Sequence, residues 1–534
     1  MKTVVRGLAA VGLIFVAVVT FRVLVPPAGF EPIGTCIDGD IDLNDPEPFA
    51  QLKPSETVVA LAASGGGSRA AYLAAAVLRE MRRSGVRAET GEPKDALSIL
   101  SQLDAVSAVS GGALAGGYFV ANSAELGSAD ADTKAWTNFA DNMALSFRSR
   151  QWYGRALADP RIWAKYLFTS YHRGLLARDD YDATLFKGAT TLGDLPLRPA
   201  LYINAFDVAN HVRFVFSRHY INTWFYQPRN AWGKLSAPQE LTSENDLSFA
   251  KVAPNSVKLA DAVTASSAFP FIYPNVALRH CGTKILFQGS RIFLADGALA
   301  DNSGLLTLMT QLRAQLDSSK GPHRVLVISI DASLNRLDTN GSRFQQRGDE
   351  ERYAWVSTFF GHGVETIDSA VTLMQDIGWK FLEGTGVETD QINMNWETSL
   401  TQRKGTCGPA AKSSWENMFE DGRLSLRPLI IRLGLRDIMN PDFEGQYGAS
   451  LAPVRQRLDE LARLNRITGD WQKMRSTMRE TLSGIHTDFV LTDDNRRALD
   501  LAAFLLVNGK LASDLAVWNT ITSTTAPVVG QACP

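Results

Sequence analysis

The sequence predicts an α/β protein in which a central, mostly parallel sheet is flanked by helices. Two successive units of strand, glycine-containing turn and helix, at residues 56–83 and 103–123, are typical of such a sheet, and a further buried strand is predicted at Arg324–Ile330. In parallel sheets of this kind, functional groups gather where the carboxyl ends of the strands meet the following helices. We therefore expect the functional site at the two glycine-containing turns.

The individual elements follow from local patterns. The run ETVVALAA at 56–63 lies between Pro54 and a group of glycines, as expected of a buried strand, and helix formers fill the segment that follows. Beyond residue 335 the signal weakens, with a possible strand and two amphipathic helical segments. The remaining predicted strands are 103–109, 200–206, 212–217 and 292–295; the later predictions are a short helix within 257–274 that ends before Pro270, a strand at 426–436, and helices at 454–482 and 496–518.

The amino terminus departs from this globular pattern. The run LAAVGLIFVAVVTF at 8–21 carries no charge, and it follows Lys2 and Arg6. A basic start and an apolar run fit a membrane anchor or a cleaved secretory signal, and the lack of a nearby small-x-small cleavage site favours the anchor. Since basic residues stay on the cytoplasmic side, we expect the N-terminus in the cytoplasm and the body outside it. A cleaved signal with a secreted or periplasmic body, or a buried helix, is the alternative.

Charge and cysteine content exclude other classes of protein. The 534 residues include 54 Lys and Arg against 56 Asp and Glu, which leaves a net charge of −2 and argues against a nucleic-acid-binding protein. Four cysteines without CxxC spacing indicate neither a zinc site nor a disulfide scaffold. If the body is exported, they can pair, with Cys407 and Cys533 as one possibility.

The first turn, Ser64-Gly65-Gly66-Gly67, predicts an anion site. Consecutive glycines each weaken ordered structure by roughly 0.5–1 kcal/mol relative to alanine, so packing alone does not explain them. They make sense where backbone N–H groups at a helix N-terminus must face an oxygen atom. The glycines alone do not distinguish a phosphate from the oxyanion of acyl transfer.

The second turn favours acyl transfer. Ser110 stands at a predicted strand-to-helix corner with Ala108 two residues before it and Gly112 two residues after it, a near match to the G-x-S-x-G nucleophile elbow. None of the seven histidines has a recognisable catalytic context. Asp296, followed by Gly297 directly after a short apolar strand, is the better candidate base, because desolvation can raise a carboxyl pKa toward working pH.

Four segments together resemble the patatin-like phospholipase family, and the glycine turn with Arg69 is also similar to cytosolic phospholipase A2. They are SGGGSRAA at 64–71, SAVSGGA at 107–113, TASSAFPF at 264–271 and LADGALADNSG at 294–304. The resemblance implies a three-layer fold and a Ser-Asp dyad that hydrolyses acyl esters of lipids. It implies Ser110 as nucleophile, Asp296 as base and the N–H groups of Gly65, Gly66 and Gly67 as oxyanion hole, with supporting roles for Arg69, Gly112 and Gly297.

Arg69 matches the basic residue that follows the glycines in the family, where it would steady the turn or attract a phosphate headgroup. Departures from the family pattern are Ala108 in place of the first elbow glycine and Ala298 after the DG pair. Neither removes a reacting group. The expected function is a phospholipase A or lysophospholipase type of esterase acting on phospholipid or lysophospholipid, without metal or cofactor. The alternatives are an acyltransferase that uses the same acyl-enzyme and a catalytically silent, membrane-tethered lipid-binding protein.

The predicted domain organisation places an anchor at 1–27, a linker at 28–55, the catalytic domain at 56–335 and a C-terminal extension at 336–534. Aromatic and basic residues alternate at 134–178, within a helical insertion of about 134–190. Since tryptophan and tyrosine favour the headgroup region and arginine attracts anionic lipid, this region is a candidate membrane contact. A helical lid with core aromatic residues explains it equally well.

Overall fold

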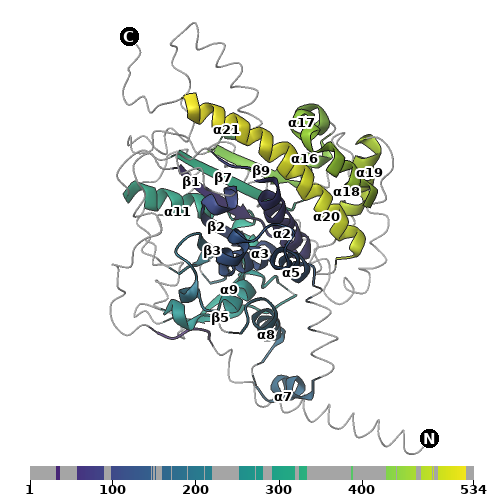
Figure 1. Cartoon of the computed structure of the whole chain (residues 1–534). Coiled ribbons are helices and arrows are strands. Elements are labelled where there is room, and N and C mark those ends of the chain that lie inside the picture. Colours follow the sequence, from purple (N-terminus) through teal and green to yellow (C-terminus); the bar gives the residue numbers. More distant parts are fainter. Residues whose placement is uncertain are drawn as a thin grey trace, which may run out of the picture.

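Figure 1 shows the computed structural model of the protein. The predicted anchor at 1–27 and Cys407 and Cys533 lie outside the residues that the structure describes. Within those residues, no helix is long and apolar enough to cross a bilayer. The structure describes residues 32–36, 57–88, 98–145, 147, 151, 159–169, 171–188, 190–209, 211–218, 252–270, 272–280, 291–318, 324–333, 387–388, 429–440, 442–464, 471–483, 485 and 491–524.

Among the described residues, the centre of the fold is a nine-stranded sheet in the order β5-β6-β3-β2-β1-β7-β9-β8, with β4 paired to β3. Parallel pairing runs from β3 through to β8, whereas β4 and β6 lie antiparallel to β3 and β5 lies antiparallel to β6. The predicted mixed α/β fold with a mostly parallel sheet is confirmed. The strands are β1 (Thr57–Ala63), β2 (Leu103–Val109), β3 (Ala200–Asp207), β4 (Val212–Phe216), β5 (Val276–Arg279), β6 (Arg291–Asp296), β7 (Arg324–Asp331), β8 (Val387–Glu388) and β9 (Leu429–Gly434).

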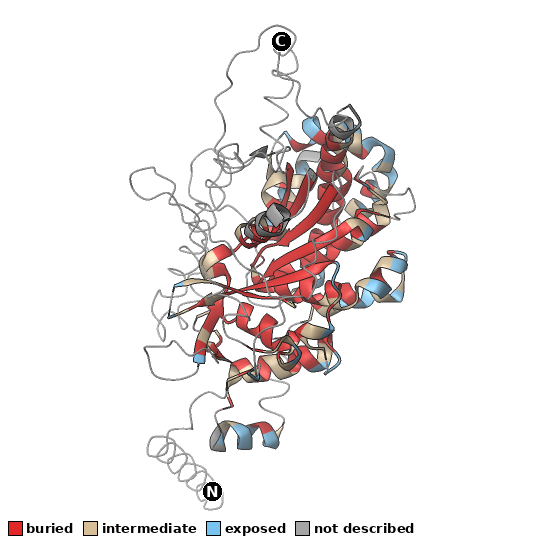
Figure 2. Cartoon of the chain, turned by 90° about the vertical axis from the view of Figure 1, so that its left-hand side faces the viewer, coloured by how far each residue is buried: buried red, intermediate tan, exposed pale blue. Residues whose placement is uncertain are grey.

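Both faces of the sheet are buried, which explains why β1 is a continuous apolar run rather than an alternating one. Val59, Leu61 and Ala63 pack into one core with α2 (Gly67–Ser84), α3 (Gly111–Ala121) and α20 (Asp493–Leu505). Val58, Ala60 and Ala62 pack on the other side against α11 (Leu305–Ser318). Figure 2 shows the buried sheet between these helical layers.

The remaining helices surround these layers. Those of the first half are α4 (Ser123–Ser128), α5 (Lys134–Met143), α7 (Pro160–Phe168), α8 (Arg173–Leu185), α9 (Leu259–Ser266) and α10 (Ala298–Asp301), with 3-10 turns η1 (Ile99–Gln102), η3 (Leu192–Asp194) and η4 (Pro254–Ser256). Those of the last hundred residues are α16 (Leu435–Met439), α17 (Phe443–Leu451), η5 (Ala452–Val454), α18 (Arg455–Leu464), α19 (Trp471–Ser483), the π-helix η6 (Leu506–Leu511) and α21 (Ala512–Thr524).

The C-terminal region contributes to the sheet as well as to the helical layer. The predicted strand at 426–436 is β9, which pairs in parallel with β7, while the predicted segment 454–482 contains two helices, α18 and α19. In Figure 1, α20 and α21 run along the same side of the sheet as α2. The sheet therefore extends beyond the predicted boundary at residue 335.

Charged side chains join α2 to this C-terminal region. The buried Glu80 accepts hydrogen bonds from both guanidinium nitrogens of Arg457, at 3.0 and 2.8 Å, and from Asn508 at 2.9 Å. The neighbouring Arg79 donates to Asp500 at 2.8 Å, and nearer the start of α2 the Tyr72 hydroxyl donates to the same carboxylate at 3.2 Å. The helix that begins at the glycine turn is thus held along its length by residues from the end of the chain.

The aromatic and basic region divides into a buried and an exposed part. Trp136 of α5 and Phe147 are core residues, and Tyr171 is also buried. On α7, by contrast, Trp163 is 49% exposed and Lys165 is exposed. The core-aromatic explanation applies to α5, and only α7 presents an aromatic and basic surface within the described part of 134–178; Figure 2 shows α7 as a mostly exposed helix at the edge of the molecule.

A short N-terminal segment docks on the predicted catalytic domain at 56–335. Ile33 forms a parallel bridge with Leu278, and Cys36 forms an antiparallel bridge with Val252. Cys36 is disulfide-bonded. The segment that follows the predicted anchor is therefore attached to the body of the protein at residues 33–36.

Candidate active site

Ser110 occupies a strained corner between β2 and α3. Its backbone has φ 50° and ψ −119°, a left-handed conformation that is uncommon for a residue with a side chain. Only 6% of the residue is exposed. The predicted nucleophile elbow is therefore present in the geometry of the chain as well as in the residue pattern.

The glycines after Ser110 are required by the close approach of the first turn. A Cβ atom on Gly111 would lie 1.9 Å from the carbonyl oxygen of Gly67, and one on Gly112 would lie 2.5 Å from that of Ala63. The clashing atoms belong to the backbone, which cannot move aside as the end of a flexible side chain can. The glycine turn and the elbow therefore pack against each other through their backbones, which brings the two predicted motifs into one site.

Asp296 lies beside Ser110, as predicted. The Ser110 hydroxyl donates a 2.8 Å hydrogen bond to Asp296 Oδ2, and Asp296 Oδ1 accepts one of 2.9 Å from the Ala298 backbone N–H. Within the described structure, this carboxylate rather than a histidine is the acceptor for the Ser110 proton.

The direction of β6 explains how Asp296 reaches the elbow. β3 continues past the level of Val109, which pairs with Asn204, and its next residue, Ala205, pairs with Asp296 of the antiparallel β6. β6 thus starts beyond the edge of the parallel strands and runs back to end at the elbow. The turn after Asp296 passes close to the backbone of β3. It requires glycine at 297, because a Cβ atom there would lie 2.3 Å from the Asn204 carbonyl oxygen.

The surroundings of Asp296 favour a proton acceptor that works near neutral pH. The residue is 1% exposed, and burial raises its pKa to about 7, while the hydrogen bonds from Ala298 and Ser110 act in the opposite direction. Desolvation penalises the charged form of a carboxylate. Asp296 therefore gains basicity without losing its hydrogen bond to Ser110.

Two glycines of the turn, Gly66 and Gly67, form the start of α2. Gly66 and Gly67 have φ values of 136° and 61°, which an L-residue with a side chain rarely adopts. Neither N–H donates a recorded hydrogen bond to any described residue, whereas the Gly65 N–H donates to the Asn302 carbonyl oxygen at 2.8 Å. Of the three predicted oxyanion donors, Gly66 and Gly67 are thus available to a ligand, and Gly65 has a structural bond.

Arg69 connects the glycine turn to the C-terminal region. Its Nη1 donates a 3.0 Å hydrogen bond to the Ile485 carbonyl oxygen, and its Nη2 lies 3.9 Å from the position of a Cβ atom on Gly66. This contact fits the steadying role more directly than recognition of a headgroup.

Several supporting residues were not singled out by the sequence. Asn204 donates to the Ser107 hydroxyl at 3.0 Å and to the Ala108 carbonyl at 3.1 Å, and the Ser107 hydroxyl donates to the Gly304 carbonyl at 2.7 Å. These bonds join β2, β3 and the turn after α10 beneath the elbow. Ser107 lies in one of the matched segments, but Asn204 has no sequence signal of its own.

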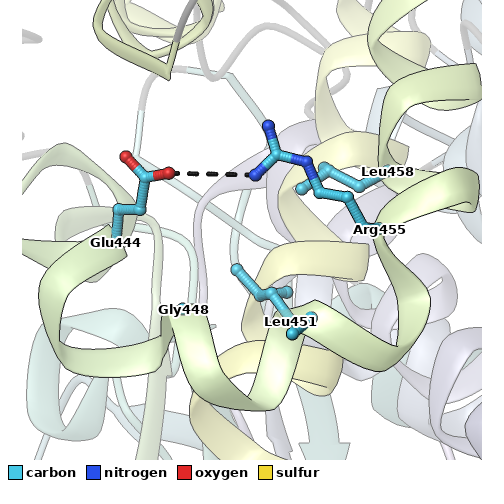
Figure 3. Close-up of a pocket in the computed structure, with 6 residues that line it drawn as sticks. Glu444, Gly448, Leu451, Arg455 and Leu458 are labelled. Atoms are coloured by element: carbon cyan, nitrogen blue, oxygen red, sulfur yellow. Dashed lines mark ion pairs between the residues drawn. The ribbon is translucent and has the colours of Figure 1, made fainter.

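A surface pocket of about 280 Å³ lies away from this site, between α17 and α18. It is lined by Leu451, Ala452 and Leu458 together with Gly448, and Glu444 and Arg455 face each other across it at 3.8 Å (Figure 3). It contains no serine, cysteine or histidine. The pocket thus has no part in the chemistry of Ser110.

Comparisons with known proteins give one match to a sequence family and several distant structural likenesses. Solved structures with a detected likeness include human GIVD cytosolic phospholipase A2, at 13% identity and TM-score 0.30, over 56% of this chain and 48% of that chain. The same protein in complex with methyl gamma-linolenyl fluorophosphonate gives 14% identity and TM-score 0.31, over 91% and 61%. VipD from Legionella pneumophila gives 12% identity and TM-score 0.21, over 78% and 67%.

These TM-scores carry no argument about this chain, which spans about half to three fifths of the length of the human structures. No curated protein sequence matches it. The informative match is to the family model described as patatin-like phospholipase, over residues 61–309. That range contains Ser110, Asp296 and all three glycines of the turn. Residues 61–309 of this chain are therefore similar in sequence to patatin-like phospholipases.

Proposed function

We propose that the protein is a lipid acyl hydrolase that cleaves carboxylic esters of phospholipids or lysophospholipids through an acyl-serine intermediate. The observation that carries the proposal is the 2.8 Å hydrogen bond from the Ser110 hydroxyl to Asp296, a carboxyl whose pKa burial raises to about 7. A nucleophile and a base in direct contact are the minimum for covalent acyl transfer. The family match supports a lipid ester as substrate.

In the proposed reaction, Asp296 takes the hydroxyl proton while Ser110 Oγ attacks the ester carbonyl carbon. The carbonyl oxygen becomes an oxyanion and accepts hydrogen bonds from the Gly66 and Gly67 N–H groups, each worth about 2.7–4 kcal/mol in comparable enzymes. Collapse of this intermediate breaks the ester C–O bond, and the leaving alcohol takes the proton from Asp296. Water, deprotonated by Asp296, then attacks the acyl-enzyme and releases the fatty acid.

The decisive experiment is covalent labelling with a fluorophosphonate probe. We expect labelling at Ser110 in the wild-type protein and none in Ser110→Ala; Asp296→Ala should abolish ester hydrolysis while circular dichroism shows a folded protein. Absence of labelling in the folded wild type would favour the silent lipid-binding alternative. Activity that survives Asp296→Ala and disappears in a histidine variant would refute the dyad.

Product analysis separates hydrolysis from transfer. Both reactions share the acyl-serine intermediate, and they differ in whether water or an alcohol accepts the acyl group. With lysolipid or glycerol added, we expect free fatty acid to remain the main product. A predominantly acylated acceptor would indicate an acyltransferase.

We further propose that α7 contacts anionic lipid. Trp163 is 49% exposed, and Arg161 and Lys165 are exposed on the same short helix. An indole and two cations suit a negatively charged headgroup layer. In a protein lacking residues 1–30, Trp163→Ala should weaken binding to vesicles containing anionic phospholipid, measured by co-sedimentation.

The matched control for α7 is Leu464→Ala, which removes another large apolar side chain, 54% exposed, from α18. It should leave vesicle binding unchanged. Equal losses in the two variants would contradict a specific role for α7. Higher salt should also weaken wild-type binding, because the contribution of the two cations is screened.

We also propose that the N-terminal segment anchors the protein with its body outside the cytoplasm, or is cleaved to release it there. The disulfide at Cys36 supports this location, because such bonds persist in oxidising compartments. Protease added to cells whose outer envelope has been opened, but whose cytoplasmic membrane is intact, should digest the body of the protein that remains with the cells. Complete protection of the body would contradict the proposal.

A further inference from the structure

The segment 266–268, which begins with the last residue of α9, touches both members of the proposed dyad. The Ser110 backbone N–H donates a 2.8 Å hydrogen bond to the Ser266 hydroxyl. The backbone N–H groups of Asp296 and Gly297 donate to the carbonyl oxygens of Ala268 and Ser266, at 3.1 and 3.2 Å. One short segment therefore holds the nucleophile residue on one side and the base residue on the other.

The bond to Ser110 differs in kind from ordinary backbone pairing. Ser110 lies at a corner with positive φ, between the end of β2 and the first residue of α3, and belongs to neither element. A side-chain hydroxyl is the acceptor instead. Ser266 is fully buried, with 0% exposure, so water does not replace the hydroxyl easily if it is removed. An unpaired buried N–H group costs free energy. Rotation of the backbone at Ser110 can relieve that cost.

We infer that Ser266 is a positioning residue for the Ser110–Asp296 pair, an inference that rests on the proposed hydrolase function. Its hydroxyl holds the corner in the conformation that directs the Ser110 side chain toward Asp296, and its carbonyl holds the turn after Asp296. The Ser266 hydroxyl bonds the backbone N–H of Ser110, whereas the reacting Ser110 Oγ bonds Asp296. Ser266 acts through the backbone on either side of the dyad.

The neighbouring Ser267 provides a matched control. It is also buried, at 2% exposure, and its hydroxyl has no hydrogen-bond partner among the described residues. Replacing either serine by alanine removes one oxygen atom from the same helix end. Only the change at Ser266 removes an interaction with Ser110.

The test compares Ser266→Ala with Ser267→Ala in the full chain. We expect Ser266→Ala to lower both kcat and the rate of fluorophosphonate labelling by about tenfold to a hundredfold, as expected for one unpaired buried donor, with KM nearly unchanged. Ser267→Ala should behave as wild type. Because the Ser110 hydrogen bond lowers the pKa of Asp296, a displaced corner should also move the midpoint of the labelling profile to higher pH. A general loss of stability does not shift this midpoint.

A second measurement is independent of activity. In hydrogen exchange followed by mass spectrometry, the peptide that contains residues 106–112 should exchange faster in Ser266→Ala than in Ser267→Ala, because the Ser110 amide has lost its acceptor. If the two variants label at equal rates and exchange alike, Ser266 has no positioning role. If the wild type is folded but unlabelled at Ser110, the proposed function fails, and the exchange comparison still decides whether Ser266 holds the corner.

Discussion

Asp296 sets the pH dependence that we expect of the proposed hydrolysis. Burial raises the pKa of this carboxyl to about 7, and only the ionised form can accept the Ser110 proton. With an uncharged ester substrate, kcat/KM should therefore rise as the pH passes through about 7 and level off above it. A profile that is flat across neutral pH, or one that falls there, would contradict Asp296 as the base.

The raised pKa of Asp296 also predicts how the stability of the folded protein depends on pH. The ordinary carboxyl value of 3.8 applies to the unfolded chain, so the folded protein retains the proton to a higher pH and loses stability as the pH rises from about 4 to about 7. Asp296→Asn removes the base, and it also removes the loss of stability that comes from ionising a buried carboxyl. The variant should be inactive at every pH, and its gain in Tm over wild type should be larger at pH 8 than at pH 5.

At the scale of elements, the contact between the two turns fixes where the oxyanion donors stand relative to Ser110. Gly112→Ala would place a Cβ atom 2.5 Å from the Ala63 carbonyl oxygen, so the turn and the elbow must separate. We expect a loss of about 1–3 kcal/mol of stability from overpacking and slower fluorophosphonate labelling of the protein that remains folded. Thermal denaturation and labelling rates measure the two effects.

The matched control for Gly112 is Gly127→Ala in α4, where a Cβ atom would meet nothing within 4 Å. In an exposed helix this change is neutral or stabilises by up to about 1 kcal/mol, and labelling should be unaffected. Similar labelling rates in the two variants would mean that the packing of the turns does not limit the reaction.

At the scale of the whole molecule, the cluster of Glu80, Arg457 and Asn508 connects α2 to the C-terminal region of the chain. Glu80→Ala leaves Arg457 and Asn508 without their shared carboxylate. We expect the free energy of unfolding to fall by about 2–4 kcal/mol. This is less than the largest losses seen for fully buried ion pairs, because the Arg457 side chain is 34% exposed. Denaturant unfolding measures this loss.

A surface ion pair of the same region is the comparison for Glu80. Glu444 and Arg455, whose side chains are 47% and 57% exposed, lie 3.8 Å apart, and Glu444→Gln should cost no more than about 1 kcal/mol. Equal effects of the two substitutions would show that the cluster does not join the two regions.

The sequence predicts those parts of the fold and site that depend on neighbours along the chain. The strands, the glycine turn, the elbow at Ser110 and the turn after Asp296 each have a local pattern, and the structure brings these residues together. Ser266 and Ile485 act through contacts with residues 156 and 416 positions away, which no local pattern reports. For the same reason β9 was expected only as a possible strand, and its place beside β7 depends on the assembled sheet.

The hydrogen bond between Arg69 and Ile485 also bears on the order in which the protein is made. Synthesis delivers the N-terminal part of a chain first, so Ser110 and Asp296 both emerge long before the carbonyl group that fixes Arg69 beside the glycine turn. β9 likewise arrives after both residues of the pair. An unfinished copy therefore carries the reacting residues without the completed turn next to them. The contact that fixes Arg69 beside the proposed oxyanion donors thus forms only when the chain is nearly complete.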